Sequence, residues 1–158
     1  MPRYFYFGLL LLGIALTALL LSSSYRTEPQ GIGHYARGEF GGVSLRIEFA
    51  TTTAAQEKGL GGRRSIPSDY GMLFVFPRDG YYGFWMKDTL IPLDMFWLDD
   101  KGQVVSMAQN VATSTYPEVF YPSAPARYVL ETAAGFAQAH GIATDTPFVL
   151  QNWPSVSK

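Results

Sequence analysis

A run of 18 residues without a charged side chain, residues 4–21 (YFYFGLLLLGIALTALLL), constrains this chain more than any other feature. As a helix the run would be about 27 Å long, close to the ~30 Å hydrocarbon core of a bilayer. It is apolar on every face and terminal, which disfavours a buried core helix. It is also longer than the roughly 7–15 apolar residues of a cleaved signal peptide, and serines follow it. We therefore predict an uncleaved membrane anchor within residues 1–24, with a cleaved signal sequence as the alternative.

The residues after the run indicate how the rest of the chain is organised. Residues 25–34 are polar and carry Pro29, Gly31 and Gly33, which is typical of a flexible linker. Residues 35–158 have the length of one domain. We expect a single-pass membrane protein, attached through residues 4–21, whose globular domain lies outside the cytoplasm. Cleavage would instead give a secreted or periplasmic protein.

Composition excludes several classes of function. The chain has 12 Lys+Arg against 13 Asp+Glu, and this balance argues against a nucleic-acid partner. It has no cysteine, so it cannot form a disulfide framework, a thiol nucleophile or a zinc ribbon. The two histidines, His34 and His140, lie far apart and form no H-x-x-H pair. We expect no metal site and no cofactor.

Short apolar segments with period-two alternation predict a sheet. Val43, Leu45, Ile47 and Phe49 alternate with more polar residues, as in a half-buried strand, and a Gly41-Gly42 turn precedes them. The fold class we predict is α+β and predominantly antiparallel, a compact, barrel-like sheet with two short helices behind an N-terminal transmembrane helix. The expected strands are residues 37–40, 43–50, 72–76, 81–87, 93–98, 103–109, 127–132 and 147–151.

Local signals place the helices and connections. Thr53 and Gln56 have the spacing of a capping box, which predicts a helix to about residue 58. Residues 133–140 predict a second short helix that ends at Gly141. Residues 99–102 (DDKG) predict a hairpin turn, and the proline-containing residues 111–126 predict a long loop.

The segment with the most unusual chemistry is residues 83–94, GFWMKDTLIPLD. On a strand, Phe84 and Trp85 point to opposite faces, and Lys87 shares a face with Trp85. A buried ammonium without a partner is costly, so Lys87 must reach solvent, pair with a carboxylate or line a wet pocket. Asp88 and Asp94 are the nearest acids. The segment indicates either a ligand pocket with an aromatic wall or a structural salt bridge on an aromatic core.

Two further charged residues are candidates for the same region. Arg64 follows the glycine-rich residues 59–62, where it could meet an anion or simply be solvated. Glu131 comes at the end of an expected strand, either as a pocket carboxylate or as a charge at a helix N-terminus. The candidate ligand-binding residues are Arg64, Trp85, Lys87, Asp88, Asp94 and Glu131.

Taken together, these segments resemble one family. The matching pieces occur in one order: residues 56–60 (QEKGL), 64–67 (RSIP), 71–76 (GMLFVF), 84–87 (FWMK), 91–94 (IPLD) and 129–131 (VLE) with Gly135. The pattern resembles the DUF 192 family, small bacterial and archaeal domains that often follow a signal peptide or anchor. The resemblance covers residues 43–149 and implies a shared region for Arg64, Lys87, Asp94 and Glu131, but no reaction. The family usually has Met at the position of Gly61 and Asn at that of Asp88.

Three functions remain open from the sequence. The first is a binding module for a saccharide, a cell-envelope fragment or another small polar molecule, since ligand sites combine aromatic walls with a few polar groups. The second is a hydrolase or lyase that uses Asp94 and Glu131 as an acid/base pair, although no catalytic motif is present. The third is a structural or partner-docking domain, with the aromatic loop of residues 116–125 as a docking surface or an ordinary covering loop.

Overall fold

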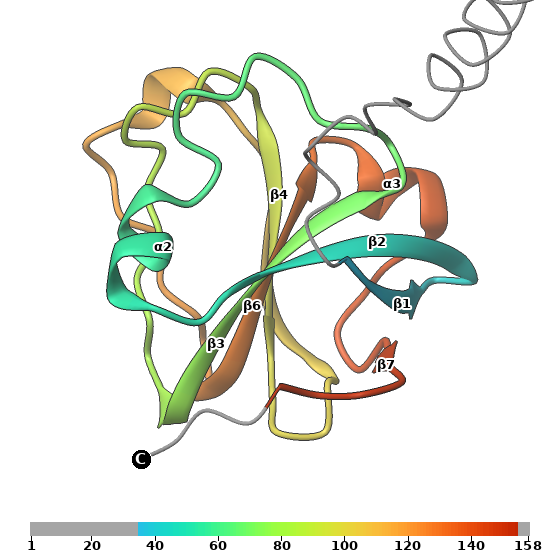
Figure 1. Ribbon diagram of the computed structural model, residues 1–158. Helices are drawn as coiled ribbons and strands as arrows, with labels where there is room; N and C mark the ends of the chain where they lie inside the picture. Colours follow the sequence, from blue (N-terminus) through green and yellow to red (C-terminus); the bar gives the residue numbers. More distant parts are fainter. Residues whose placement is uncertain (1–34, 155–158) are drawn as a thin grey trace, which may run out of the picture. The chain divides into compact units, whose positions relative to one another are not determined.

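The computed structural model describes residues 35–154, which form one β-rich domain (Figure 1). The predicted anchor in residues 4–21 and the linker up to residue 34 lie outside the described residues. Among those that are described, no helix is long and apolar enough to cross a membrane. The elements are β1 (Ala36–Phe40), β2 (Val43–Ala50), α2 (Thr53–Lys58), β3 (Tyr70–Gly80), β4 (Leu93–Leu98), β5 (Val104–Val111), the 3₁₀ helix η1 (Thr113–Thr115), β6 (Ala126–Ala133), α3 (Phe136–His140) and β7 (Phe148–Leu150).

The strands form one mixed sheet in the order β5-β4-β6-β3-β2-β1-β7. Five of its six strand pairings are antiparallel. The pairing of β2 with β3 is parallel. A parallel pair needs a crossover connection, and residues 51–69, which include α2, provide it. The predicted antiparallel sheet is therefore confirmed with one parallel pair added.

The sheet curls until its two edges nearly meet, as expected for a partly closed barrel. The N–H of Phe148 donates to the carbonyl of Gly102 at 2.8 Å, and the N–H of Val104 donates to the carbonyl of Thr146 at 3.1 Å. These bonds join the β4–β5 turn to the start of β7. The result is the curled half-barrel seen in Figure 1.

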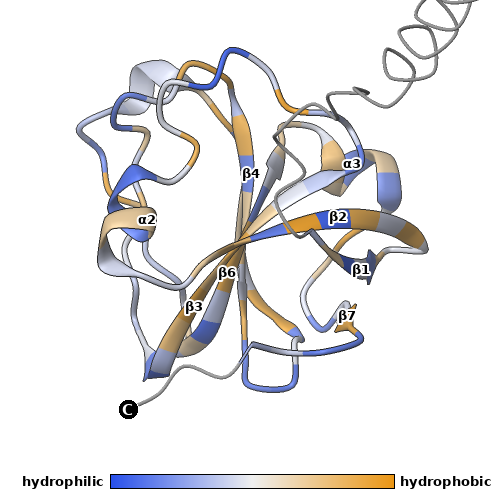
Figure 2. Cartoon of the chain, viewed as in Figure 1, coloured by the Kyte–Doolittle hydropathy of each residue, from blue (hydrophilic) through white to orange (hydrophobic). Residues whose placement is uncertain are grey.

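Each face of the sheet has its own hydrophobic core, because successive side chains of a strand point to opposite faces. The barrel core lies inside the curl under α3. Its members include Phe40, Phe96, Phe136, Phe148, Leu73, Leu98 and Leu130. The pocket-side core lies on the other face, with Leu60, Met72, Phe74, Phe84, Met86, Met95, Trp97 and Val129 among its members. Figure 2 shows apolar colour along parts of β3 and β6, the paired strands in the middle of the sheet between the two cores.

The predicted elements agree with the structure except at three places. Residues 81–87 do not form a strand, because β3 itself continues to Gly80 and the chain then has only an isolated bridge, between Phe84 and Phe120. The cap of α2 is Thr52, not Thr53: its hydroxyl accepts from the N–H of Ala55 at 3.2 Å. The second helix is only Phe136–His140, because β6 extends through Ala133.

Candidate functional site

A pocket of about 230 Å³ opens on the face of the pocket-side core. Its walls come from α2, from β3, from the irregular residues 82–89 and from one residue of β6. The lining residues are Thr53, Gln56, Glu57, Lys58, Gly59, Leu60, Phe74, Phe76, Tyr82, Gly83, Phe84, Trp85, Lys87, Thr89 and Glu131. Three of the six candidate residues, Trp85, Lys87 and Glu131, are among them.

Aromatic rings form a fixed wall of the pocket. Phe76 and Tyr82 are stacked, with ring centroids 3.6 Å apart, and Phe74 meets Phe84 edge to face at 4.8 Å. The indole N–H of Trp97 donates to the backbone carbonyl of Tyr82 at 2.8 Å and ties this wall to β4. Phe74 and Phe76 were not predicted as site residues, although their period-two spacing on one strand places both on the pocket face.

Helix α2 closes another side of the pocket and is attached to the sheet by Gln56. The side-chain amide of Gln56 donates to the carbonyls of Ala50 at 3.2 Å and Val75 at 2.9 Å. Sequence analysis gave this residue a capping role within its own helix. The structure shows instead that it joins the helix to the end of β2 and the middle of β3.

Glu131 is the buried acid among the residues that line the pocket. On β6 it is paired with Met72 of β3 on one side and Met95 of β4 on the other, and its side chain is only 4% exposed. Within the described residues, its buried Oε2 atom has no hydrogen-bond partner. Burial raises the pKa of Glu131 to about 8. At neutral pH it is therefore a protonated acid, with a hydroxyl that can donate a hydrogen bond to an occupant of the pocket.

Trp85 and Lys87 lie at the solvent side of the pocket. Trp85 is 50% exposed while Phe84 is buried, so only Phe84 is covered by the core. Lys87 is exposed, and no salt bridge to it is found among the described residues. It reaches solvent rather than pairing with an acid, one of the outcomes left open by the sequence.

Asp88 has a backbone role in the same loop. It adopts a left-handed conformation, with φ of 55°, which Asn and Asp tolerate better than other residues with a side chain. Its carbonyl accepts from the N–H of Gly62 at 2.9 Å, and its side chain is exposed outside the pocket. Because this conformation suits both residue types, it accounts for Asp88 at a position where the family usually has Asn.

Asp94 does not belong to the pocket. It is fully buried on β4, where Oδ1 accepts from the N–H of Asn110 at 2.7 Å and Oδ2 accepts from the N–H of Ala137 at 2.8 Å. In register it lies opposite Thr132, while Glu131 lies opposite Met95. Asp94 and Glu131 consequently point to opposite faces of the sheet. The predicted acid/base pair of Asp94 and Glu131 is therefore wrong.

Arg64 also lies outside the pocket, on the exposed surface of the crossover. Its neighbour Arg63, by contrast, forms hydrogen bonds with other side chains. The guanidinium of Arg63 donates to Glu48 and to the Tyr70 hydroxyl, each at 2.8 Å, and Tyr70 donates to Glu48 at 2.7 Å. Burial opposes ionisation of Glu48, but the two hydrogen bonds outweigh it and hold its pKa below the usual value. The group ties the crossover to β2, so the predicted shared region for Arg64, Lys87, Asp94 and Glu131 contains only Lys87 and Glu131.

Comparisons with known proteins agree with the resemblance read from the sequence. Residues 36–149 match the DUF192 family, described as Uncharacterized ACR. A comparison with curated proteins finds no match. A solved structure from Sinorhizobium meliloti 1021, described as a candidate transcription regulator, is 27% identical with a TM-score of 0.70, covering 76% of this chain and 98% of that one. A protein of unknown function from Novosphingobium aromaticivorans DSM 12444 is 28% identical with a TM-score of 0.68, covering 77% and 89%. The near-complete coverage of the first of these chains indicates that such a domain folds on its own.

Proposed function

The chain belongs to the DUF192 family, and we propose that its domain is a module that binds a small polar ligand in the pocket between α2, β3 and residues 82–89. One observation carries the proposal: Glu131 is buried, its Oε2 has no hydrogen-bond partner among the described residues, and it lines a pocket with aromatic walls. A buried polar group without a partner costs about 1–3 kcal/mol, and a ligand that accepts its hydrogen bond would recover that cost.

The surroundings of Glu131 support a polar ligand with apolar faces. The wall of Phe76, Tyr82 and Phe84 offers flat apolar surface, and Trp85 adds a half-exposed ring at the mouth. Lys87 and the residues of α2 supply polar groups around the opening. Sites of this kind bind small molecules through apolar contact and are oriented by a few polar groups.

The proposal also includes a location for the domain. The uncharged residues 4–21 support attachment to a membrane, with the domain outside the cytoplasm. A saccharide or another cell-envelope fragment is then the class of ligand that the domain would meet. The alternative of a hydrolase or lyase loses its support, because Asp94 is fully hydrogen-bonded on the far face of the sheet.

A proton–nitrogen NMR titration of the domain, residues 33–158, tests the proposal. The probes are pools of cell-envelope sugars, muropeptides, nucleotides and divalent metals. Trp85 lines the pocket, whereas Trp153 packs on Tyr128 and Phe148 at the barrel core and serves as an internal control. We expect one pool to shift the Trp85 indole signal saturably while the Trp153 signal stays in place.

Matched variants show whether the pocket is responsible. Trp85→Ala and Lys87→Ala should abolish the saturable shifts of the remaining pocket signals and leave the spectrum folded. Leu90→Ala is the control, because Leu90 is a similarly exposed apolar residue of the same loop outside the pocket. A folded domain whose pocket signals ignore every pool would refute the proposal and favour a partner-docking role.

A further inference from the structure

The pocket is small for a complete ligand site. Its volume of about 230 Å³ is below the range of roughly 300–1,000 Å³ that is usual for small-molecule sites. It can enclose one substituent of a larger molecule rather than the whole. The rest of such a ligand must lie on the surface just outside, so that surface bears on the identity of the ligand.

The surface beside the pocket contains the isolated antiparallel bridge between Phe84 and Phe120. The N–H of Phe84 donates to the carbonyl of Phe120 at 2.9 Å, and the N–H of Phe120 donates to the carbonyl of Phe84 at 2.8 Å. With these two residues paired, their side chains face inward, and the alternate side chains of Trp85 and Tyr121 face outward. Their exposed fractions, 50% and 65%, agree with that arrangement.

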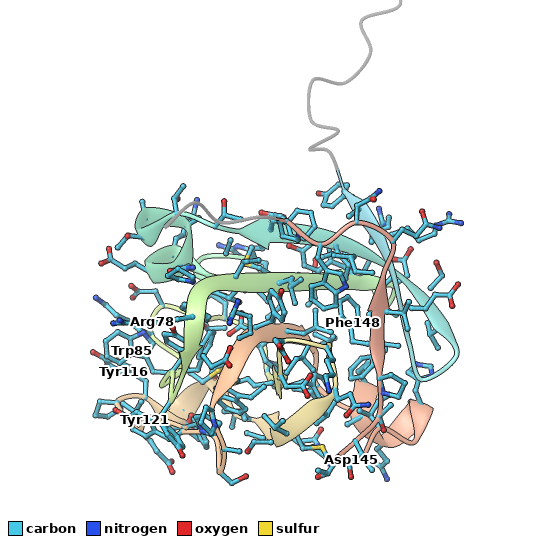
Figure 3. The ribbon with its side chains drawn as sticks, turned by 90° about the horizontal axis from the view of Figure 1, so that it is seen from below. Arg78, Trp85, Tyr116, Tyr121, Asp145 and Phe148 are labelled. Atoms are coloured by element: carbon cyan, nitrogen blue, oxygen red, sulfur yellow. The ribbon has the colours of Figure 1, made fainter. Side chains whose placement is uncertain are left out.

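The outward aromatic residues form what we call the aromatic strip, Trp85, Tyr116 and Tyr121. Gly83 leaves room for the Tyr121 ring, which lies 2.7 Å from the position that a Cβ of Gly83 would occupy. Tyr116 is 48% exposed on the same loop as Tyr121. Figure 3 shows the three side chains along one edge of the domain, and Figure 1 places their two loops on the same side. Since Trp85 also lines the pocket, the strip is continuous with it.

The pocket offers a hydrogen-bond donor in apolar surroundings, whereas the aromatic strip offers exposed rings, and together these features narrow the class of ligand. Inside, Glu131 can donate a hydrogen bond among the apolar side chains of Leu60, Phe74 and Phe84, which suits a carbonyl oxygen next to a methyl group. Outside, flat rings with polar edges suit the apolar faces of sugar rings. Stacked nucleic-acid bases would need a positive groove as well, but the lining of the pocket carries an acid, Glu57, beside the cations Lys58 and Lys87, and the chain has a net charge of −1.

We propose that the pocket and the aromatic strip form one site for a chain of N-acetylated amino sugars. The acetamido group of one sugar enters the pocket, where its carbonyl accepts a hydrogen bond from Glu131. The following sugar rings stack on Trp85 and Tyr121. This inference rests on the proposed function and names the class of ligand for that same pocket.

Titrations of the domain with N-acetylglucosamine, its dimer and its tetramer, and with the deacetylated glucosamine tetramer, test the assignment. We expect affinity to rise from monomer to tetramer and the deacetylated tetramer to bind at least tenfold more weakly. Tyr121→Ala should lower the affinity for the acetylated tetramer about tenfold, which corresponds to about 1.4 kcal/mol of binding free energy. It should also reduce the factor by which the tetramer binds more tightly than the monomer. Leu90→Ala should change neither.

Glu131→Met provides a second, independent variant. Methionine has a similar size and matches the neighbouring Met72 and Met95, and removal of an unpartnered buried polar group does not destabilise a core. The variant should fold and lose the preference for the acetylated tetramer.

The possible outcomes separate this inference from the proposed function. If another pool shifts the Trp85 signal and no N-acetylglucosamine oligomer does, the small-ligand proposal stands and the amino-sugar assignment is overturned. Equal affinity for monomer and tetramer would show that the aromatic strip does not bind the following sugar rings. Equal affinity for the acetylated and deacetylated tetramers would show that the acetamido group makes no contact in the pocket. Either result would overturn the inference.

Discussion

Asp94 and Glu131 are buried acids on the neighbouring strands β4 and β6, yet their surroundings are opposite in kind. Asp94 faces the barrel core side, where two backbone N–H groups bond its two oxygens. Glu131 faces the pocket-side core between two methionines, and in the part of the chain that the structure describes its Oε2 has no partner. The first acid joins α3 and the end of β5 to the sheet. The Oε2 atom of the second makes no hydrogen bond to a described residue, so it can bond to a ligand in the proposed site.

The largest effect should come from removing the structural acid. Asp94→Ala leaves the N–H groups of Asn110 and Ala137 buried without acceptors, and we expect it to lower the free energy of unfolding by about 3–5 kcal/mol. Urea unfolding measures this change. Asp88→Asn is the matched control, since Asp88 is exposed and asparagine tolerates its backbone conformation. A loss below about 1 kcal/mol for Asp94→Ala would remove the contrast between the two acids.

The pH dependence of stability should come from the other acid. The unfolded chain releases the Glu131 proton above its ordinary pKa of 4.5, whereas the folded domain keeps it up to about 8. Stability is therefore full below pH 4.5 and falls between pH 4.5 and 8, by at most about 1.4 kcal/mol per pH unit and about 5 kcal/mol in total. Urea unfolding across this range should show the fall in the natural domain and its absence in Glu131→Gln. Parallel pH profiles for the two proteins would show that Glu131 ionises freely.

A smaller effect is expected where α2 is attached to the pocket face. Gln56→Ala removes two hydrogen bonds to the carbonyls of Ala50 and Val75, which should cost about 1–2 kcal/mol of unfolding free energy. Hydrogen exchange should quicken in α2 and leave α3 unchanged, because the two helices belong to different faces. Glu57→Ala, on the exposed side of the same helix, serves as control. An equal increase of hydrogen exchange in α2 and α3 would mean that the two faces of the sheet do not open independently.

The smallest contrast concerns two adjacent arginines. Arg63→Ala removes the contacts to Glu48 and Tyr70, and because this group is about one-third exposed we expect a loss of only about 1 kcal/mol. Arg64→Ala should change stability by less than about 0.5 kcal/mol. Thermal unfolding of both variants measures the difference. A larger loss for Arg64→Ala would show that the wrong arginine was assigned the structural role.

Local patterns predicted much of the fold and only part of the site. The alternation in residues 43–50, the Gly41-Gly42 turn and the hairpin turn at residues 99–102 depend on neighbours in the chain, and the structure has all three. The parallel pair of β2 and β3 depends on tertiary packing, so no local signal gave it. Trp85, Lys87 and Glu131, which line the pocket, were candidates from their residue types and their positions on expected strands. The separation of Asp94 from Glu131 required the register between β4 and β6, which joins segments far apart in sequence.

The pairing of β1 with β7 has a consequence for how this domain is combined with others. Gly38, near the start of the first strand, lies opposite Leu150 at the end of the last. Both ends of the fold thus leave from one site on the sheet, and neither end contributes a residue to the pocket. A domain with adjoining ends tolerates insertion into a host loop and fusion on either side. Insertion or fusion of this domain at its ends should therefore leave the proposed ligand pocket undisturbed.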